Sequence, residues 1–76
     1  MLVTSAQLRA ARALLNWTVR DLAEQAGVHR NTVTNFETGK YGGDPETLAA
    51  MKAALEDAGV EFTNGKRPGV RLAAKT

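Results

Sequence analysis

The residues of this sequence that could do chemistry gather in one short segment near its middle. Arginine, asparagine and threonine recur there at helical spacing, on the face of a predicted helix opposite Val33 and Phe36. None of them is needed for packing, so their hydrogen-bonding groups are free to meet a partner. Arginine can form paired hydrogen bonds with guanine, and asparagine can form them with adenine. The four residues are Arg30, Asn31, Thr34 and Asn35.

Residues suited to catalysis or metal binding do not occur together in the chain. The absence of cysteine excludes disulfides and thiolate metal sites, and the single histidine argues against a zinc site. No histidine, acid and nucleophile form a plausible set, and Gly42-Gly43 resembles a linker rather than a phosphate-binding loop. We therefore expect no enzyme activity, no cofactor and no metal.

The length and composition indicate one small intracellular domain. A chain of 76 residues buries only about 60% of its unfolded surface on folding, so a partner subunit is the expected source of further burial. The chain has no signal peptide and no apolar run approaching the roughly 20 residues of a membrane span, which predicts a cytoplasmic, nucleoid-associated protein without membrane contact. The net charge of +2 permits DNA binding without arguing for it.

Four helices are predicted from apolar residues that recur every three or four positions. Capping boxes at Thr4 and Thr18 mark the start of two of them. Gly27 and Gly59 are placed to end two helices. Arg9 and Arg12 are expected to lie in solvent, off the apolar stripe of the first helix. The predicted helices cover residues 5–15, 19–26, 30–37 and 44–58.

A β-hairpin is predicted after residue 59, where the apolar period changes from 3.6 to 2. Asn64-Gly65 is a strong turn signal between the two short runs. The hairpin could fold back over its own helices, or the hairpins of two subunits could pair into one sheet. The second arrangement is favoured, because the apolar side chains need more cover than a small bundle offers. The predicted dimer interface is then Val60, Phe62, Val70 and Leu72.

The segment 18–39 has the pattern of two short helices that cross steeply over a tight turn. Ala23 stands where the helices approach most closely, and Gly27 follows four residues later to make the turn. We expect a β-branched or charged residue at position 23, or any side chain at position 27, to break this crossing. Apolar residues occupy the positions that must face the core, which are 22, 26, 28, 33 and 36.

In this segment the sequence resembles the Cro and lambda-repressor-like, or xenobiotic-response-element type, helix-turn-helix proteins. The runs LAEQAGV at 22–28 and FETGK at 36–40 are its most specific parts, and the resemblance covers about residues 4–58. It implies a mainly α, four-helix DNA-binding domain over residues 1–58, with a hairpin and short tail at 59–76. It also implies that helix 30–37 enters the major groove of double-stranded DNA, with Arg30, Asn31, Thr34 and Asn35 at base edges.

The resemblance further implies phosphate contacts from the start of the second helix and from the loop after the third. Val19 stands where the family usually has glutamine, so this contact is weakened or passes to Arg20. His29 stands where serine or threonine often caps the third helix, so we expect a poor cap that faces the DNA backbone instead. The predicted backbone-contacting residues are Thr18, Val19, Arg20, His29, Thr38, Lys40 and Tyr41.

Two functions follow from these observations. The first is a dimeric transcription regulator of a bacterium or mobile element, which binds a pseudo-palindromic operator and is controlled by concentration or by an antagonist protein. The second is a protein-interaction or antitoxin-like module with weak DNA binding. The polar exposed face of the third helix favours the first. Lys66 and Arg67, in the hairpin loop, are expected to serve solubility.

Overall fold

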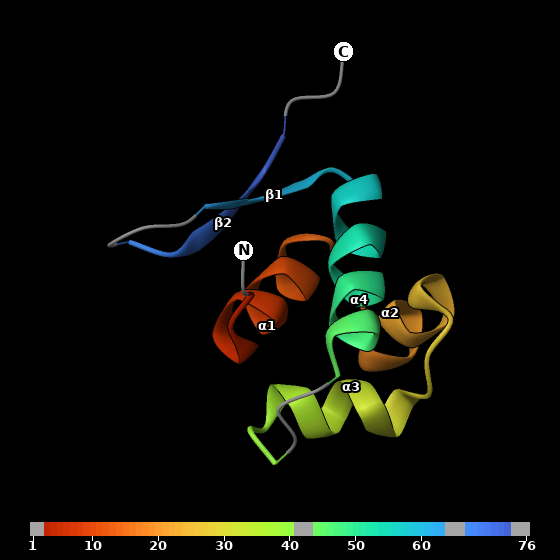
Figure 1. Cartoon of the computed structure of the whole chain (residues 1–76). Coiled ribbons are helices and arrows are strands. Elements are labelled where there is room, and N and C mark those ends of the chain that lie inside the picture. Colours follow the sequence, from red (N-terminus) through yellow and green to blue (C-terminus); the bar gives the residue numbers. More distant parts are fainter. Residues whose placement is uncertain (1–2, 41–43, 64–66, 74–76) are drawn as a thin grey trace.

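The chain forms a small helical bundle with a hairpin over one end (Figure 1). The computed structural model describes residues 3–40, 44–63 and 67–73. The third helix, α3 (Arg30–Glu37), lies across the end of the bundle opposite the hairpin. Within these residues no helix is long and apolar enough to cross a membrane. The mainly α fold with a short C-terminal hairpin is thus confirmed, and its elements are α1 (Ser5–Leu14), α2 (Val19–Ala26), α3 (Arg30–Glu37), α4 (Pro45–Asp57), β1 (Val60–Thr63) and β2 (Gly69–Leu72).

The helices begin where side chains can accept the first backbone N–H groups. The hydroxyl of Thr4 accepts from the amide of Gln7 at 3.1 Å, and the Gln7 side chain accepts from the amide of Thr4 at 2.9 Å. Thr18 and Asp21 form the same reciprocal box at the start of α2. Asp44 caps α4 and is followed by a proline at the first helical position. The predicted starts of all four helices are confirmed.

The turn between α2 and α3 depends on the backbone conformation of Gly27. This residue has φ 71° and ψ 31°, in the left-handed region that favours glycine. A Cβ built there would meet no atom within 4 Å. The positive φ expected of Gly27 is confirmed, and because the space is open, a side chain at position 27 is disfavoured by this φ and not by a clash. Ala23, by contrast, is buried at 5% exposure.

The core lies where all four helices and β1 meet. α2 packs against both α3 and α4, and the hairpin packs against α1 and α4. Five large side chains have no exposed surface, and they come from every helix. The bundle therefore fixes the orientation of α3 by burying one of its faces. The fully buried side chains are Leu8, Leu22, Val33, Met51 and Leu55.

The hairpin packs on its own helices. Its register pairs Val60 with Leu72 and Phe62 with Val70, so the four apolar residues do share one face. Val60 is 2% exposed within the chain, and Phe62 and Val70 pack against the core. Leu72 alone remains half exposed, at 50%. The expected dimer interface must be corrected accordingly, because Val60 already has its cover in the subunit and presents no surface to a second one.

Gln7 fastens the hairpin to α1. Its side-chain amide donates to the carbonyl oxygens of Thr63 and Gly69, at 3.0 and 3.1 Å. These two residues are cross-strand partners and form the last pair before the hairpin loop. Gln7 is 4% exposed, so both of its amide hydrogens are satisfied inside the protein. One side chain therefore caps α1 and holds both strands.

Candidate nucleic-acid interface

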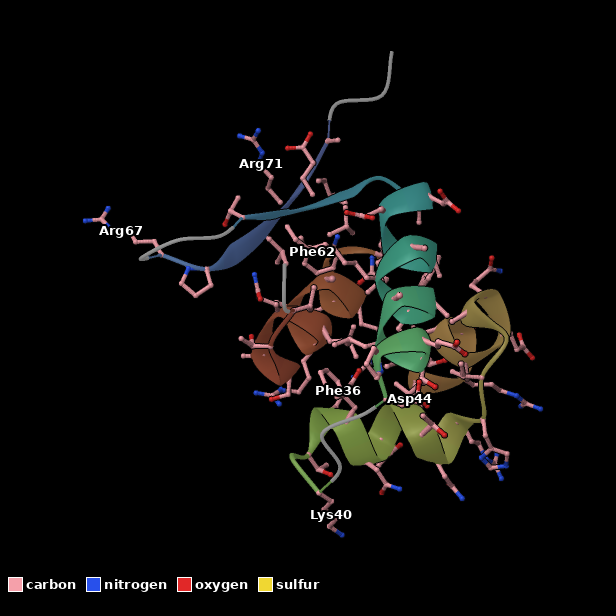
Figure 2. All side chains as sticks on the ribbon, viewed as in Figure 1. Phe36, Lys40, Asp44, Phe62, Arg67 and Arg71 are labelled. Atoms are coloured by element: carbon pink, nitrogen blue, oxygen red, sulfur yellow. The ribbon has the colours of Figure 1, made fainter. Side chains whose placement is uncertain are left out.

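The polar face of α3 is open to solvent along its whole length. All four residues expected to contact bases are exposed, while Val33 and Phe36 on the other face are buried. Figure 2 shows Phe36 pointing into the bundle and Lys40, just after α3, pointing away from it. Among the described residues, no internal hydrogen bond or ion pair uses the side chains of these four. Their donors and acceptors are therefore available to an external partner; they belong to Arg30, Asn31, Thr34 and Asn35.

An ion pair with α1 holds the C-terminal end of α3. The guanidinium of Arg12 donates to both carboxylate oxygens of Glu37, at 2.7 and 2.8 Å. It also donates to the carbonyl oxygen of Trp17 at 2.9 Å, and Arg9 donates to the carbonyl oxygen of Glu37. The hydrogen bond to Glu37 raises the pKa of Arg12 above its ordinary value. Arg12 therefore positions α3, and the expectation that it lies in solvent is wrong.

The sequence does contain a signal for this pair. Arg12 lies four residues after Leu8, and Glu37 lies four residues after Val33, so each charge falls on the buried stripe of its helix. A charge on a buried stripe needs a partner of opposite sign. When two helices pack together and each has such a charge, the two charges are expected to pair. The buried stripe of α1 therefore includes Arg12 as well as its apolar residues.

His29 caps α3, contrary to the expectation that it would be a poor cap. Its Nδ1 atom accepts a hydrogen bond from the backbone amide of Asn31 at 3.0 Å. The residue has extended backbone angles, φ −74° and ψ 142°, which are those of an N-cap. The imidazole nitrogen thus does the work of the serine or threonine oxygen. The ring remains exposed, next to the residues that were expected to contact bases.

The start of α2 offers fewer donors than its position suggests. The amide of Thr18 already donates to the Asp21 carboxylate, and the amide of Asp21 donates to the Thr18 hydroxyl. Val19 is half-buried and packs against the core, so only its backbone N–H can face a phosphate. Arg20 is the strongest candidate for a phosphate contact at this end of α2. Its side chain is 75% exposed, and its ion pair with the carboxylate of Glu24 is long, at 3.8 Å from Nε.

The segment after α3 contributes one free cation. Lys40 is exposed, and no hydrogen bond or ion pair within the described part of the chain uses its side chain. The hydroxyl of Thr38 donates to the carbonyl oxygen of Thr34 at 2.9 Å, so its hydrogen is used to close α3. Thr38 can therefore only accept. Tyr41, the remaining residue expected to contact the backbone, lies outside the described residues.

Comparisons with known proteins agree with this geometry. Residues 5–61 match the family described as helix-turn-helix domain. The chain belongs to the helix-turn-helix DNA-binding family. It is also similar to an uncharacterized HTH-type transcriptional regulator of Methanocaldococcus jannaschii, with 46% identity over 48 residues. That alignment covers 63% of this chain and 70% of the relative.

The helix-turn-helix match ends inside the hairpin. It contains all four helices and the first residues of β1, and β2 lies beyond it. The hairpin also lies at the far end of the molecule from the helix-turn-helix face. Figure 2 shows Arg67 near the hairpin loop, well away from Lys40. Arg67 therefore lies well apart from the end of the molecule that carries Lys40.

Proposed function

We propose that this helix-turn-helix protein binds a specific double-stranded DNA sequence and regulates transcription. The observation that carries the proposal is the exposed polar face of α3, whose side chains take no part in packing or in internal hydrogen bonds. The name of the Methanocaldococcus jannaschii relative, a transcriptional regulator, supports the same role. The short helix would lie in the major groove, with its N-terminal residues at the bases.

The chemistry of the face suits direct reading of bases. The guanidinium of Arg30 matches the O6 and N7 atoms of guanine, and the amides of Asn31 and Asn35 match N6 and N7 of adenine. Thr34 adds a hydroxyl and a methyl group, which suit a base edge and a thymine methyl. Each good paired contact contributes about 1–3 kcal/mol of discrimination against the wrong base.

The phosphate contacts would come from both sides of the recognition helix α3. Arg20 and Lys40 are exposed cations, and the pair of Arg20 with Glu24 is too open to water to hold the arginine back. The amides of Val19 and Arg20 and the hydroxyl of Thr18 can add hydrogen bonds. Such contacts set the register of the protein on the duplex without carrying sequence information.

The first experiment is selection from a pool of random duplexes, followed by sequencing, at fixed salt. The native protein is expected to enrich one motif, and the Arg30→Ala/Asn31→Ala variant to lose it. Arg67→Ala is the charge-matched control, because it removes an exposed cation far from α3 and outside β2, and it should leave the motif intact. Lys40→Ala should weaken binding to all sequences alike and reduce the salt dependence by about one phosphate contact.

A flat selection would contradict this function. Suppose that the native protein and the Arg30→Ala/Asn31→Ala variant bind all duplexes equally, and that added salt weakens the binding of both. Then α3 does not read bases. The alternative of a protein-interaction or antitoxin-like module would then be the better account.

We also propose that the active species is a homodimer on a roughly palindromic site. One short helix reads only a half-site, and two related by a twofold axis read sites about one DNA turn apart. With Val60 buried in its own subunit, Leu72 and the outward edge of β2 are the surface left for this contact. This surface is narrower than the four residues expected from the sequence.

The dimer is tested by measuring molar mass over a range of concentrations. Leu72→Ser should shift the protein toward monomer and weaken binding to the palindromic site more than to one half-site. Leu14→Ser is the matched control, because Leu14 is the other large hydrophobic side chain that the described residues leave exposed, at 39%. Equal masses for both variants and the native protein, or a selected motif without twofold symmetry, would contradict the proposal.

A further inference from the structure

We propose that His29 is a positioning residue for base recognition and acts only as the neutral imidazole, so that discrimination between DNA sequences falls when the ring is protonated. The inference rests on the proposed function, since it concerns the helix that would meet the bases. It starts from one contact, the hydrogen bond of 3.0 Å from the amide of Asn31 to Nδ1 of His29.

That hydrogen bond fixes the protonation state of the ring. A ring nitrogen can accept only through a free lone pair, so Nδ1 carries no proton and the single proton of the neutral ring sits on Nε2. The imidazolium has an N–H at both positions and cannot accept. Protonation therefore removes the cap, and it also places a positive charge at the positive end of the helix dipole of α3.

The cap holds the turn that matters most for recognition. The amide it satisfies is that of Asn31, and Arg30 lies between this residue and His29. α3 has eight residues and no acidic residue in its first turn, so no other side chain on the helix stabilises its start. The other three helices are capped by Thr4, Thr18 and Asp44, which do not titrate near neutral pH.

The charged groups around His29 keep their charge near neutral pH. The ring lines a shallow pocket with Arg20 and Glu24 of α2 and Arg30 of α3. Arginines keep their charge, and glutamates ordinarily titrate well below neutral pH. His29 is also the only histidine of the chain. Among these groups the imidazole is therefore the one through which a change of pH near neutrality can act on the start of α3.

Protonation has two effects on DNA binding, and they differ in kind. The added positive charge attracts phosphates of any sequence alike. Release of the first turn of α3 frees Arg30 and Asn31, whose contacts are with bases. The first effect raises affinity for all duplexes, and the second lowers affinity for the specific one. The ratio of specific to non-specific affinity therefore isolates the cap.

The test measures this ratio from about pH 5.5 to 8, across the histidine titration range, at constant ionic strength. The native protein should lose discrimination by about three- to tenfold toward acid pH, the effect of a lost N-cap. His29→Asn keeps a good cap that does not titrate, so its ratio should be flat. His29→Ala should have the low ratio at every pH. A flat native ratio, or the same pH profile in His29→Asn, would overturn the inference.

A second measurement needs no DNA. In the free protein, the nuclear magnetic resonance signal of the Asn31 amide should follow the titration of the His29 ring, and its hydrogen exchange should accelerate as the ring protonates. If selection finds no DNA motif but the amide follows the ring, the proposed function fails while the capping switch stands. If a motif is found but the amide ignores the ring, the inference fails alone.

Discussion

Arg12 on α1 and Glu37, the last residue of α3, form a two-bond ion pair largely out of contact with water. The side chain of Glu37 is 5% exposed and that of Arg12 is 21% exposed. Replacing both partners of a buried pair with apolar residues is often tolerated, but removing one partner leaves an uncompensated charge. The pair therefore makes the position of α3 depend on α1.

Arg12→Ala should lower the free energy of unfolding by about 3 kcal/mol, because Glu37 would then be buried without a partner. The double variant Arg12→Met/Glu37→Leu should lose much less, since it buries no charge. Urea unfolding measures both. Arg71→Ala is the control, because its pair with Glu61 is exposed and should contribute less than about 1 kcal/mol. Equal losses for Arg12→Ala and Arg71→Ala would contradict the role given to the pair.

Gln7→Glu should loosen the hairpin selectively. The carboxylate can still accept from the amide of Thr4, but it can no longer donate to Thr63 and Gly69, so the cost should be about 2 kcal/mol. Hydrogen exchange should accelerate in the hairpin and stay unchanged in α3. Gln25→Glu, at an exposed position of α2, makes the same chemical change and should have little effect. If hydrogen exchange accelerated equally in all helices and strands, Gln7 would not hold the hairpin specifically.

Substitutions at Gly27 and Ala23 should differ in cause and in size. Gly27→Ala should cost about 1 kcal/mol, because an alanine is strained at positive φ, and Gly27→Asn should cost less, because asparagine tolerates this region. Ala23→Val should cost about 1–3 kcal/mol by overpacking the helix crossing. Thermal unfolding ranks the three. An asparagine at position 27 as damaging as valine at position 23 would show that space, not φ, limits the turn.

The pKa of Asp44 lies below its ordinary value of 3.8, because the backbone N–H and then the hydroxyl of Thr47 donate to its carboxylate. A lowered native pKa means that the cap stabilises the fold above the ordinary value and that this contribution is lost as the pH falls through the lower one. Asp44→Ala should therefore lower Tm by a few degrees at neutral pH, with the difference shrinking in acid.

Asp57→Ala provides the control for Asp44, because Asp57 is the last residue of the same helix. A negative charge there opposes the helix dipole, so its removal should leave Tm unchanged or raise it. If Asp44→Ala and Asp57→Ala lower Tm equally at neutral pH, the effect is one of net charge and not of capping.

Local signals in the sequence predict most of this fold. The boxes at Thr4 and Thr18 and the glycine at position 27 act within a few residues of themselves, so their spacing is sufficient evidence. The exposed face of α3 follows from the period of Val33 and Phe36. These local features are enough to locate the helix-turn-helix segment and the exposed face of α3 without knowledge of any contact between helices.

The features that were missed depend on residues far apart in the chain. Arg12 and Glu37 are 25 residues apart, and the helical stripe of either one alone does not reveal the other. His29 was misjudged because its residue type was weighed without the geometry that brings Nδ1 to an amide. The hairpin was expected to lack cover because the sequence does not show that α1 and α4 leave a surface on which it can lie.

The clamp at Gln7 joins regions of the chain that leave the ribosome at very different times. Its two carbonyl partners lie 56 and 62 residues further along. During synthesis, Gln7 is therefore made well before the two strands whose carbonyl oxygens accept its hydrogen bonds. A chain truncated before β2 would lack both the Gly69 carbonyl that Gln7 binds and the strand that packs on α1.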